Sequence, residues 1–148
     1  MKRNLARIAI LLAAALSGGL ARADHRVVIV TSASNPLDTI SSIDLRKIYM
    51  GIPLQDEACH CTGIRNQSDR VLNEIFLQTL VSMSERDYER RLLTLTIQSG
   101  RRRPVIMTDR QSIENALRED PSLLTYMWGE EFEETSGLKV IKVLWQRE

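Results

Sequence analysis

The feature that most constrains the fold is a strand, a polar turn and a short helix that follow one another between residues 25 and 51. Residues His25–Thr31 (HRVVIVT) form an almost unbroken apolar run with β-branched residues, which is typical of a buried strand. Pro36 fixes its own φ and keeps the preceding residue extended, so the chain turns there. Ser41 or Ser42 can cap the following helix, and Gly51 suits the left-handed residue that ends it. The rest of the chain is expected to form an α/β domain around this unit.

The first 23 residues have the pattern of a secretory signal peptide. A basic start is followed by an apolar run over residues 8–16 and by a small-x-small cleavage site at residues 21–23. The apolar run is too short for a stable membrane anchor, although an uncleaved anchor is the alternative. We therefore expect residues 1–23 to be a signal peptide and residues 24–148 to form the mature domain. The protein is then periplasmic or secreted, with no membrane insertion after cleavage.

Cleavage also changes the charge of the chain. The full sequence has 20 Lys and Arg against 19 Asp and Glu. Losing Lys2, Arg3, Arg7 and Arg22 leaves 16 basic residues against 19 acidic ones, a formal charge of −3. Because nucleic-acid-binding domains are normally basic, nucleic acid is not an expected partner. The remaining 125 residues are enough for one domain with one core.

After the first helix, helix-like and strand-like segments alternate. Ser68 and Ser84 each precede apolar residues at helical spacing and are expected to cap helices, the second of which ends at Gly100. Thr108 is expected to cap a fourth helix. Residues 129–137 are expected to be an acidic loop. Strands are expected at 63–66, 105–107, 123–127 and 138–145. The alternation predicts an α/β fold with a mixed, mostly parallel sheet flanked by helices.

Residues 59–61 (CHC) are the most unusual local sequence. On an extended backbone Cys59 and Cys61 project to one side and His60 to the other. The two thiols can form a tight disulfide in an oxidising compartment, share a soft metal or remain inert. Zinc usually needs four ligands, and the only other histidine is His25, so no metal site is predicted. A disulfide between Cys59 and Cys61 is the leading interpretation.

The sequence contains no arrangement typical of catalysis. A nucleophile activated by histidine needs a histidine that a third group can orient. His25 lies beside the cleavage site and His60 lies between two cysteines, so neither is a natural base. No glycine-rich nucleotide loop is present. We therefore expect a non-enzymatic protein without a cofactor.

Two polar turns are candidates for anion binding, because helix N-termini expose unpaired amide donors with partial positive charge. The alternative is that their side chains only form turns and caps. The Arg101–Arg103 triplet could steer an anion or an acidic partner, although such a run is more often a solvated turn. The candidate ligand-binding residues are Ser32, Ser34 and Asn35 in the first turn, and Arg65, Asn66, Gln67, Ser68 and Arg70 in the second.

The order of these segments resembles that of phosphate-type periplasmic substrate-binding proteins, and in particular their short, single-lobe members. The strand, Asn-Pro turn and helix of residues 27–51 are similar to that superfamily's strand and Leu-Ser-x-x-x-Leu-x-x-Ile-Phe-x-Gly helix. Weaker similarities follow in the same order at Asn66-Gln67 before Phe76, Met83-Ser84, Gly100 with Pro104, and residues 121–126. In the last of these motifs both glycines of the superfamily are replaced, by Ser122 and Thr125.

The resemblance implies a single-lobe, periplasmic-binding-protein-like domain over residues 24–148. It also implies a secreted, non-enzymatic binding module that holds phosphate or another small anion between Ser34 and Asn35 on one side and residues 65–70 on the other. The alternative function is an envelope interaction or sensor-accessory module that keeps the fold without ligand binding. A third hypothesis is a thiol or metal protein that acts through Cys59 and Cys61.

Overall fold

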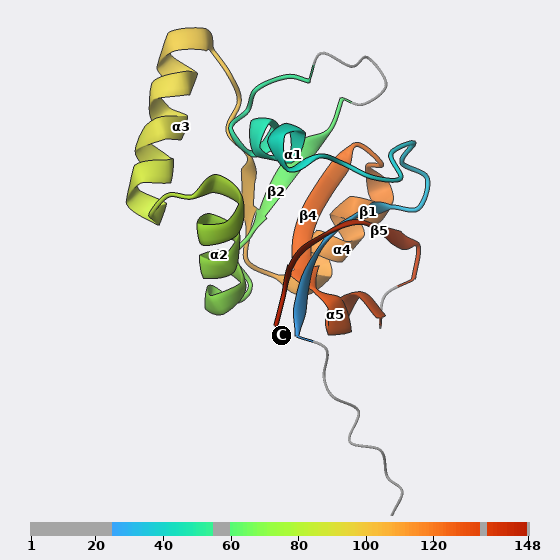
Figure 1. Ribbon diagram of the computed structural model, residues 1–148. Helices are drawn as coiled ribbons and strands as arrows, with labels where there is room; N and C mark the ends of the chain where they lie inside the picture. The colour runs from blue at the N-terminus through green and yellow to red at the C-terminus, as the bar shows by residue number, and fades with distance from the viewer. Residues whose placement is uncertain (1–24, 55–59, 134–135, 148) are drawn as a thin grey trace, which may run out of the picture.

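The protein is described here from a computed structural model that covers residues 25–54, 60–133 and 136–147. A five-stranded sheet lies between two layers of helices (Figure 1). Along the chain the elements are β1 (Arg26–Ser32), α1 (Ser42–Tyr49), β2 (Thr62–Asn66), α2 (Arg70–Phe76), the π-helix η1 (Leu77–Val81), α3 (Glu85–Ser99), β3 (Val105–Met107), α4 (Arg110–Glu119), β4 (Leu123–Trp128), α5 (Gly129–Glu133) and β5 (Leu138–Gln146). The predicted α/β class is confirmed.

The sheet is mixed and has the strand order β3-β2-β4-β1-β5. β2 pairs in parallel with β3 and with β4, whereas β1 pairs antiparallel with β4 and with β5. Strands β2, β3, β4 and β5 therefore all end at one end of the sheet, which is the end where β1 begins. We call this end the carboxyl edge and the opposite end the amino edge. The predicted mixed sheet is confirmed, but its pairings are not mostly parallel, since two are parallel and two are antiparallel.

β1 occupies an inner position because both of its faces are apolar. Val27 and Ile29 pack into a larger cluster with residues of α1, α2, η1 and α3, while Val28 and Val30 pack into a smaller cluster with Ile113 and Leu117 of α4. All four valine and isoleucine side chains of β1 are at most 1% exposed. A continuous apolar run is the sequence expected of a strand that is covered on both faces.

Four aromatic rings form the centre of the larger cluster. Phe76 stacks on Tyr126 with ring centroids 4.2 Å apart. It also makes T-shaped contacts with Tyr49 and Tyr88, with centroid distances of 4.7 and 6.0 Å. The tyrosine hydroxyls remain hydrogen-bonded inside the core. Tyr49, for example, donates to the carbonyl oxygen of Ile64 at 3.2 Å. Buried tyrosines normally keep such partners, because an unpaired hydroxyl in an apolar core is costly.

The helix boundaries confirm several local predictions. The Ser41 hydroxyl caps α1 by accepting from the Asp44 amide, and the Ser84 hydroxyl caps α3 in the same way. Gly51 and Gly100 both have positive φ, at +67° and +63°. At Gly51 a Cβ atom would also lie 2.7 Å from the carbonyl oxygen of Arg102, so the position has no room for a side chain.

Three predicted boundaries are wrong. Ser68 does not cap α2, because its hydroxyl donates to Asn66 and the Asp69 carboxylate accepts the capping amide of Leu72 instead. Asp109, rather than Thr108, caps α4 by accepting from the Ser112 amide. The stretch expected to be an acidic loop over residues 129–137 begins with the short helix α5. In the first two cases an aspartate one residue further on provides the stronger acceptor.

The signal peptide predicted at residues 1–23 lies outside the described residues. Within the part of the chain that the structure describes, no helix is both long and apolar enough to span a membrane.

Candidate functional site

The first predicted turn lies at the amino edge, beside the start of β4. The Asn35 side chain is 3% exposed and donates to the carbonyl oxygen of Pro121 at 2.6 Å. Its Oδ1 accepts from the Leu37 amide at 2.7 Å, and the hydroxyls of Ser32 and Ser34 are 2.9 Å apart. The Asn35 side chain therefore connects this turn to the neighbouring strand, and both of its polar atoms already have protein partners.

The second predicted turn lies at the carboxyl edge, at the opposite end of the sheet. Thr62, at the start of β2, pairs with Leu123 at the start of β4, whereas Thr31, near the end of β1, pairs with Leu124. The end of β1 is thus level with the start of β2. β2 has five residues, so the two turns are separated by about 15 Å along the strand direction. They do not form one site, and the expectation that an anion would lie between them is corrected.

The Asn66 side chain forms hydrogen bonds within the second turn and with β4. Asn66 is 2% exposed, and its amide donates to the Tyr126 carbonyl oxygen at 2.9 Å. Its Oδ1 accepts from both the amide and the hydroxyl of Ser68, at 3.0 and 2.6 Å. The Gln67 side chain donates to Glu85 at 2.9 Å. Asn66, Gln67 and Ser68 thus have hydrogen-bonding partners within the protein.

Arg65 is directed into the protein. It is 1% exposed, and its guanidinium contacts the carboxylates of Glu85 at 3.3 Å and of Glu89. It also lies over the ring of Tyr88, with 4.8 Å between Cζ and the ring centroid. Burial raises the pKa of the Tyr88 hydroxyl, and the nearby Arg65 charge partly opposes this shift. The Arg65 charge is therefore balanced by two acidic side chains of α3.

Arg70 has the opposite environment. Its side chain is 86% exposed, and its guanidinium lies 3.7 Å from Glu74 one turn further along α2. An exposed pair at this spacing is weak and its members exchange readily with solvent. Of the two arginines that were predicted to bind an anion, Arg70 alone is accessible from outside.

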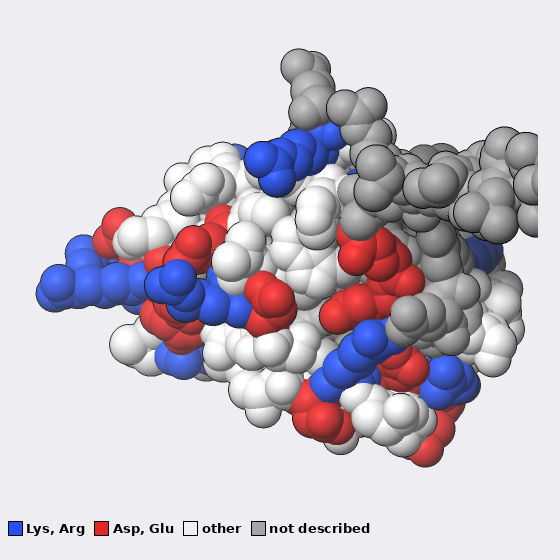
Figure 2. Space-filling model, turned by 90° about the horizontal axis from the view of Figure 1, so that it is seen from below, with Lys and Arg blue, Asp and Glu red and all other residues white. Residues whose placement is uncertain are grey.

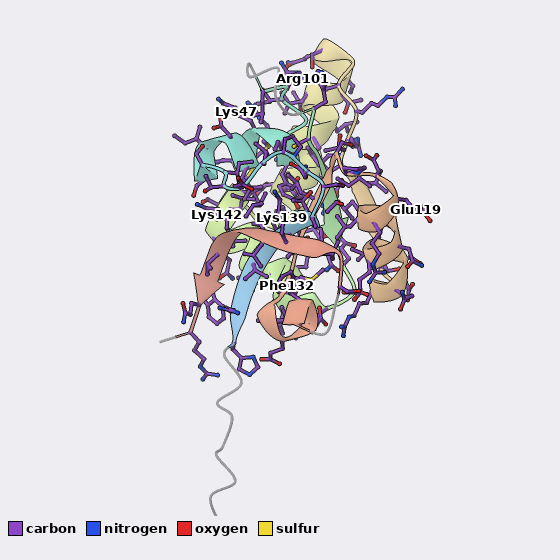
Figure 3. All side chains as sticks on the ribbon, turned by 90° about the vertical axis from the view of Figure 1, so that its right-hand side faces the viewer. Lys47, Arg101, Glu119, Phe132, Lys139 and Lys142 are labelled. Carbon is purple, nitrogen blue, oxygen red and sulfur yellow. The ribbon has the colours of Figure 1, made fainter. Side chains whose placement is uncertain are left out.

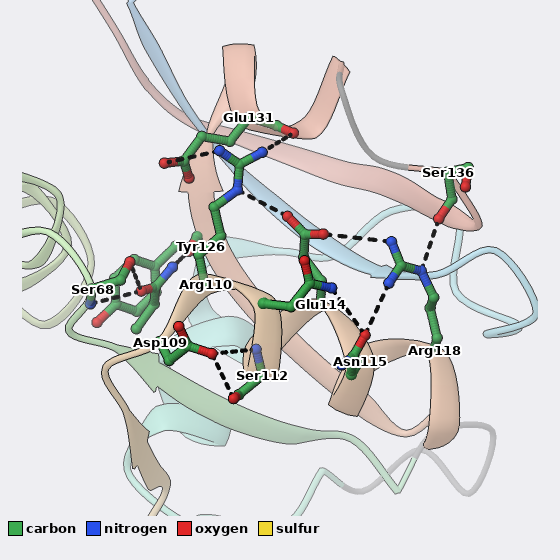
Figure 4. A network of polar contacts seen from close by, with 12 residues as sticks. Ser68, Asp109, Arg110, Ser112, Glu114, Asn115, Arg118, Tyr126, Glu131 and Ser136 are labelled. Carbon is green, nitrogen blue, oxygen red and sulfur yellow. Dashed lines mark hydrogen bonds and ion pairs between the residues drawn. The ribbon is translucent and has the colours of Figure 1, made fainter.

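A chain of alternating charges runs along α4, from its first residue to its last turn (Figure 4). Arg110 contacts Glu114 at 2.9 Å and Glu131 at 3.9 Å, and Arg118 contacts Glu114 at 3.5 Å. Arg118 also donates to the carbonyl oxygen of Ser136 at 3.2 Å. Burial raises the pKa of the Glu131 carboxyl, and the Arg110 charge opposes this rise. The sequence reasoning missed this network, although the i, i+4 spacing of Arg110, Glu114 and Arg118 indicates that they share one helix face.

The CHC segment is described in part. Cys61 is disulfide-bonded and does not titrate. Cys59 lies outside the described residues, so the predicted pairing of Cys59 with Cys61 stays a prediction. Among the residues that the structure describes, no group of three or more His, Cys, Asp or Glu side chains is placed to hold a metal ion.

The arginine triplet follows α3 and leads into β3. Arg103 lies 3.7 Å from Glu89, the same carboxylate that contacts Arg65, and both partners are partly exposed. Arg101 is half-buried and Arg102 is exposed. Arg103 therefore belongs to the same group of ion pairs as Arg65 and Glu89.

The arrangement of the sheet and helices is similar to the fold of solved phosphate-binding proteins. Comparison with solved structures supports this PstS-like fold. The chain matches an ABC-type phosphate transport receptor from Vibrio cholerae (TM-score 0.56, 10% identity), PstS from Borrelia burgdorferi (0.58, 13%) and a possible phosphate-binding protein from Planctomyces limnophilus (0.51, 14%).

Each match covers 81% of this chain, but only 46%, 47% and 42% of the respective receptor. The chain thus spans less than half the length of the receptors that it matches. No protein-family model matches the chain, and no curated protein matches it by sequence. At this level of identity the likeness establishes the fold.

Proposed function

We propose that the protein is a secreted, non-enzymatic binding module that uses one phosphate-receptor-like lobe to bind a protein partner in the cell envelope. The fold supports a binding rather than a catalytic role, since the matched structures are described as receptors and binding proteins. We choose a protein partner over an anion because aspartates of the chain itself already occupy the helix N-termini at the carboxyl edge. Asp69 caps α2 and Asp109 caps α4.

A helix N-terminus attracts an anion because its first amides are unpaired and partly positive. At α2 a carboxylate of the protein already accepts one of these amides, with 2.9 Å between Asp69 Oδ1 and the Leu72 nitrogen. A phosphate placed there would lie within a few ångströms of a like charge, which is unfavourable. α2 itself is seven residues long, and the buried Arg65 is already balanced by Glu85 and Glu89.

Binding of phosphate or another small anion is the second candidate function. The matched proteins favour it, since they are an ABC-type phosphate transport receptor, PstS and a possible phosphate-binding protein. At the carboxyl edge, Ser68 and Arg70 are exposed and Gln67 is half-buried, so these three side chains are the ones an anion would contact. Such a site would be open to solvent and weak, because the chain supplies about one lobe.

Thermal unfolding distinguishes the two functions. The melting temperature is measured in sodium phosphate and sodium sulfate and in sodium chloride at the same ionic strength. A ligand present at 100 times its dissociation constant stabilises the folded state by about 2.7 kcal/mol. We expect phosphate and chloride to give the same melting temperature. A saturable increase that is specific to phosphate, and that Arg70→Met abolishes, would establish the second function and refute the first.

Crosslinking in intact cells tests the partner directly. A photo-crosslinking amino acid is placed at Arg70, on the carboxyl edge, and separately at Asp38, whose side chain is 93% exposed in the loop after β1. We expect one stoichiometric adduct from Arg70 and none from Asp38. Equal labelling from both positions, or no adduct from either, contradicts the proposal. N-terminal sequencing of the exported protein tests cleavage before Asp24.

A further inference from the structure

A pocket of about 430 Å³ opens at the carboxyl edge, between α2, the start of α5 and the ends of β4 and β5. Its volume is within the range of small-molecule sites in proteins. The side chains of Val71 and Ile75 of α2 form one wall, and the indoles of Trp128 and Trp145 form others. Val71 is 49% exposed, which is unusual for a valine beside a cluster of aromatic residues.

The sheet register places the two tryptophans on opposite sides of one buried residue. Val27 of β1 pairs with Trp128 of β4 and with Trp145 of β5, so all three side chains project from the same face of the sheet. The indoles are two strand spacings apart, roughly 9–10 Å. Val27 is fully buried between them, and both indoles are partly buried against the larger core cluster. Both indoles line the pocket, on either side of Val27 in the sheet.

The polar lining of the pocket carries an excess of negative charge. Three carboxylates line it, from Asp69, Glu130 and Glu131, against the single guanidinium of Arg147. His25 completes the lining, with its Nδ1 3.2 Å from Glu130 and its ring edge-on to Trp128 at 5.9 Å. Seen from this end of the molecule, acidic side chains lie near the middle of the face (Figure 2).

Aromatic walls together with carboxylates favour one chemical class of ligand. A cation over an indole face is attracted by the negative face of the ring, and the attraction grows when the cation is desolvated. A carboxylate at the mouth adds direct attraction, whereas an anion such as phosphate would be repelled. From the indole spacing, the volume and the charge, we propose that this pocket binds a small organic cation, an alkylammonium group with an apolar body. The proposal does not depend on the protein partner proposed above.

The chain provides its own reporter for this site. Its two tryptophans both line the pocket, so all indole emission of the protein comes from there. The purified protein is titrated with choline and tetramethylammonium, with dimethylbutanol as the uncharged isostere of choline, and with sodium chloride and sodium phosphate at matched ionic strength. We expect a saturable change in emission with both cations, half-complete at or below about 1 mM, and no saturable change with the other three.

Two charge variants link the signal to the carboxylates. Glu130→Gln removes one charge and keeps the shape of the side chain. Asp69→Ser removes another and keeps a side-chain oxygen that can cap α2. Each is expected to weaken cation binding by about tenfold, which corresponds to 1.4 kcal/mol. Asp109→Ser is the matched control, because Asp109 caps α4 and does not line the pocket. It should leave the affinity unchanged.

Several results would overturn the proposal. Equal responses to choline and dimethylbutanol would show an apolar site without charge selectivity. A saturable response to phosphate would assign the opposite charge to the ligand. An effect of Asp109→Ser equal to that of Asp69→Ser, or no effect of Glu130→Gln in a variant with unchanged melting temperature, would show that the lining carboxylates do not contribute to binding.

Discussion

The burial of Arg65 leads to a prediction that separates a structural arginine from a ligand-binding one. Arg65→Met keeps most of the side-chain volume and removes the charge. The two lost ion pairs have partners that are 52% and 38% exposed, so each contributes about 0.5–1 kcal/mol. The lost contact with the Tyr88 ring contributes about 1 kcal/mol. The buried Nε, which has no hydrogen-bond partner within the described residues, offsets part of this, so the expected loss is about 2 kcal/mol.

For a domain of this size, 1 kcal/mol changes the melting temperature by roughly 3–5 °C. Arg65→Met should therefore melt roughly 6–10 °C below the wild type, measured by circular dichroism in phosphate-free buffer. The matched variant Arg70→Met removes an 86% exposed arginine and should melt within about 2 °C of the wild type. A double-mutant cycle between Arg65→Met and Glu89→Gln should show a coupling free energy of about 1 kcal/mol.

An Arg65→Met variant with wild-type stability would refute this reasoning, since the ion pairs would then contribute nothing. A second result for such a variant would be the loss of a phosphate-dependent increase in melting temperature that the wild type shows. In that case Arg65 would be a ligand residue that the folded protein can expose.

Other predictions concern the core and the pH dependence of stability. Phe76→Ala should lower the free energy of unfolding by about 4 kcal/mol, because Phe76 is fully buried. The same change at the partly buried Phe132 should lower it by less than half as much in urea unfolding, and equal losses would contradict the assigned core. Gly63→Ala should cost about 1–3 kcal/mol, since the new Cβ would lie 2.7 Å from the buried Tyr49 ring, and an unchanged urea midpoint would contradict this. Burial raises the pKa of the Glu131 carboxyl from 4.5, so the folded state binds more protons than the unfolded state. Stability should accordingly fall as pH rises from 4.5 through the raised pKa, and Glu131→Gln should lack this component in urea unfolding across that pH range.

Local features of the fold were predictable because their causes lie within a few residues of one another. The caps at Ser41 and Ser84 each need one hydroxyl and one amide three residues later. The same reasoning failed at Ser68, because three polar side chains in succession compete for the capping amide. Asp69 accepts that amide, and the Ser68 hydroxyl is then free to donate to Asn66. Such competition is decided by geometry that a one-dimensional pattern does not contain.

The candidate site was less predictable because it depends on strand direction. Both polar turns follow a strand and precede a helix, which suggests the same edge of a parallel sheet. β1, however, runs against β4, and nothing in residues 26–32 specifies that direction. Arg65 is a similar case, since it lies on β2 and its partners Glu85 and Glu89 are 20 and 24 residues away on α3. The pocket between Trp128 and Trp145 likewise requires the register of three strands.

The position of β1 also has a consequence for the order in which the chain can fold. The first strand pairs with β4 on one side and with β5 on the other. β5 is an outermost strand of the sheet and carries Lys139 and Lys142 (Figure 3). Residue 27 thus meets partners at residues 128 and 145.

Pairings this distant in sequence are slow to form, and the first strand must wait until the last one has been synthesised. The buried centre of the sheet is therefore completed last. For a chain exported as an extended polymer, as the proposed signal peptide implies, this connectivity delays folding until translocation is nearly finished.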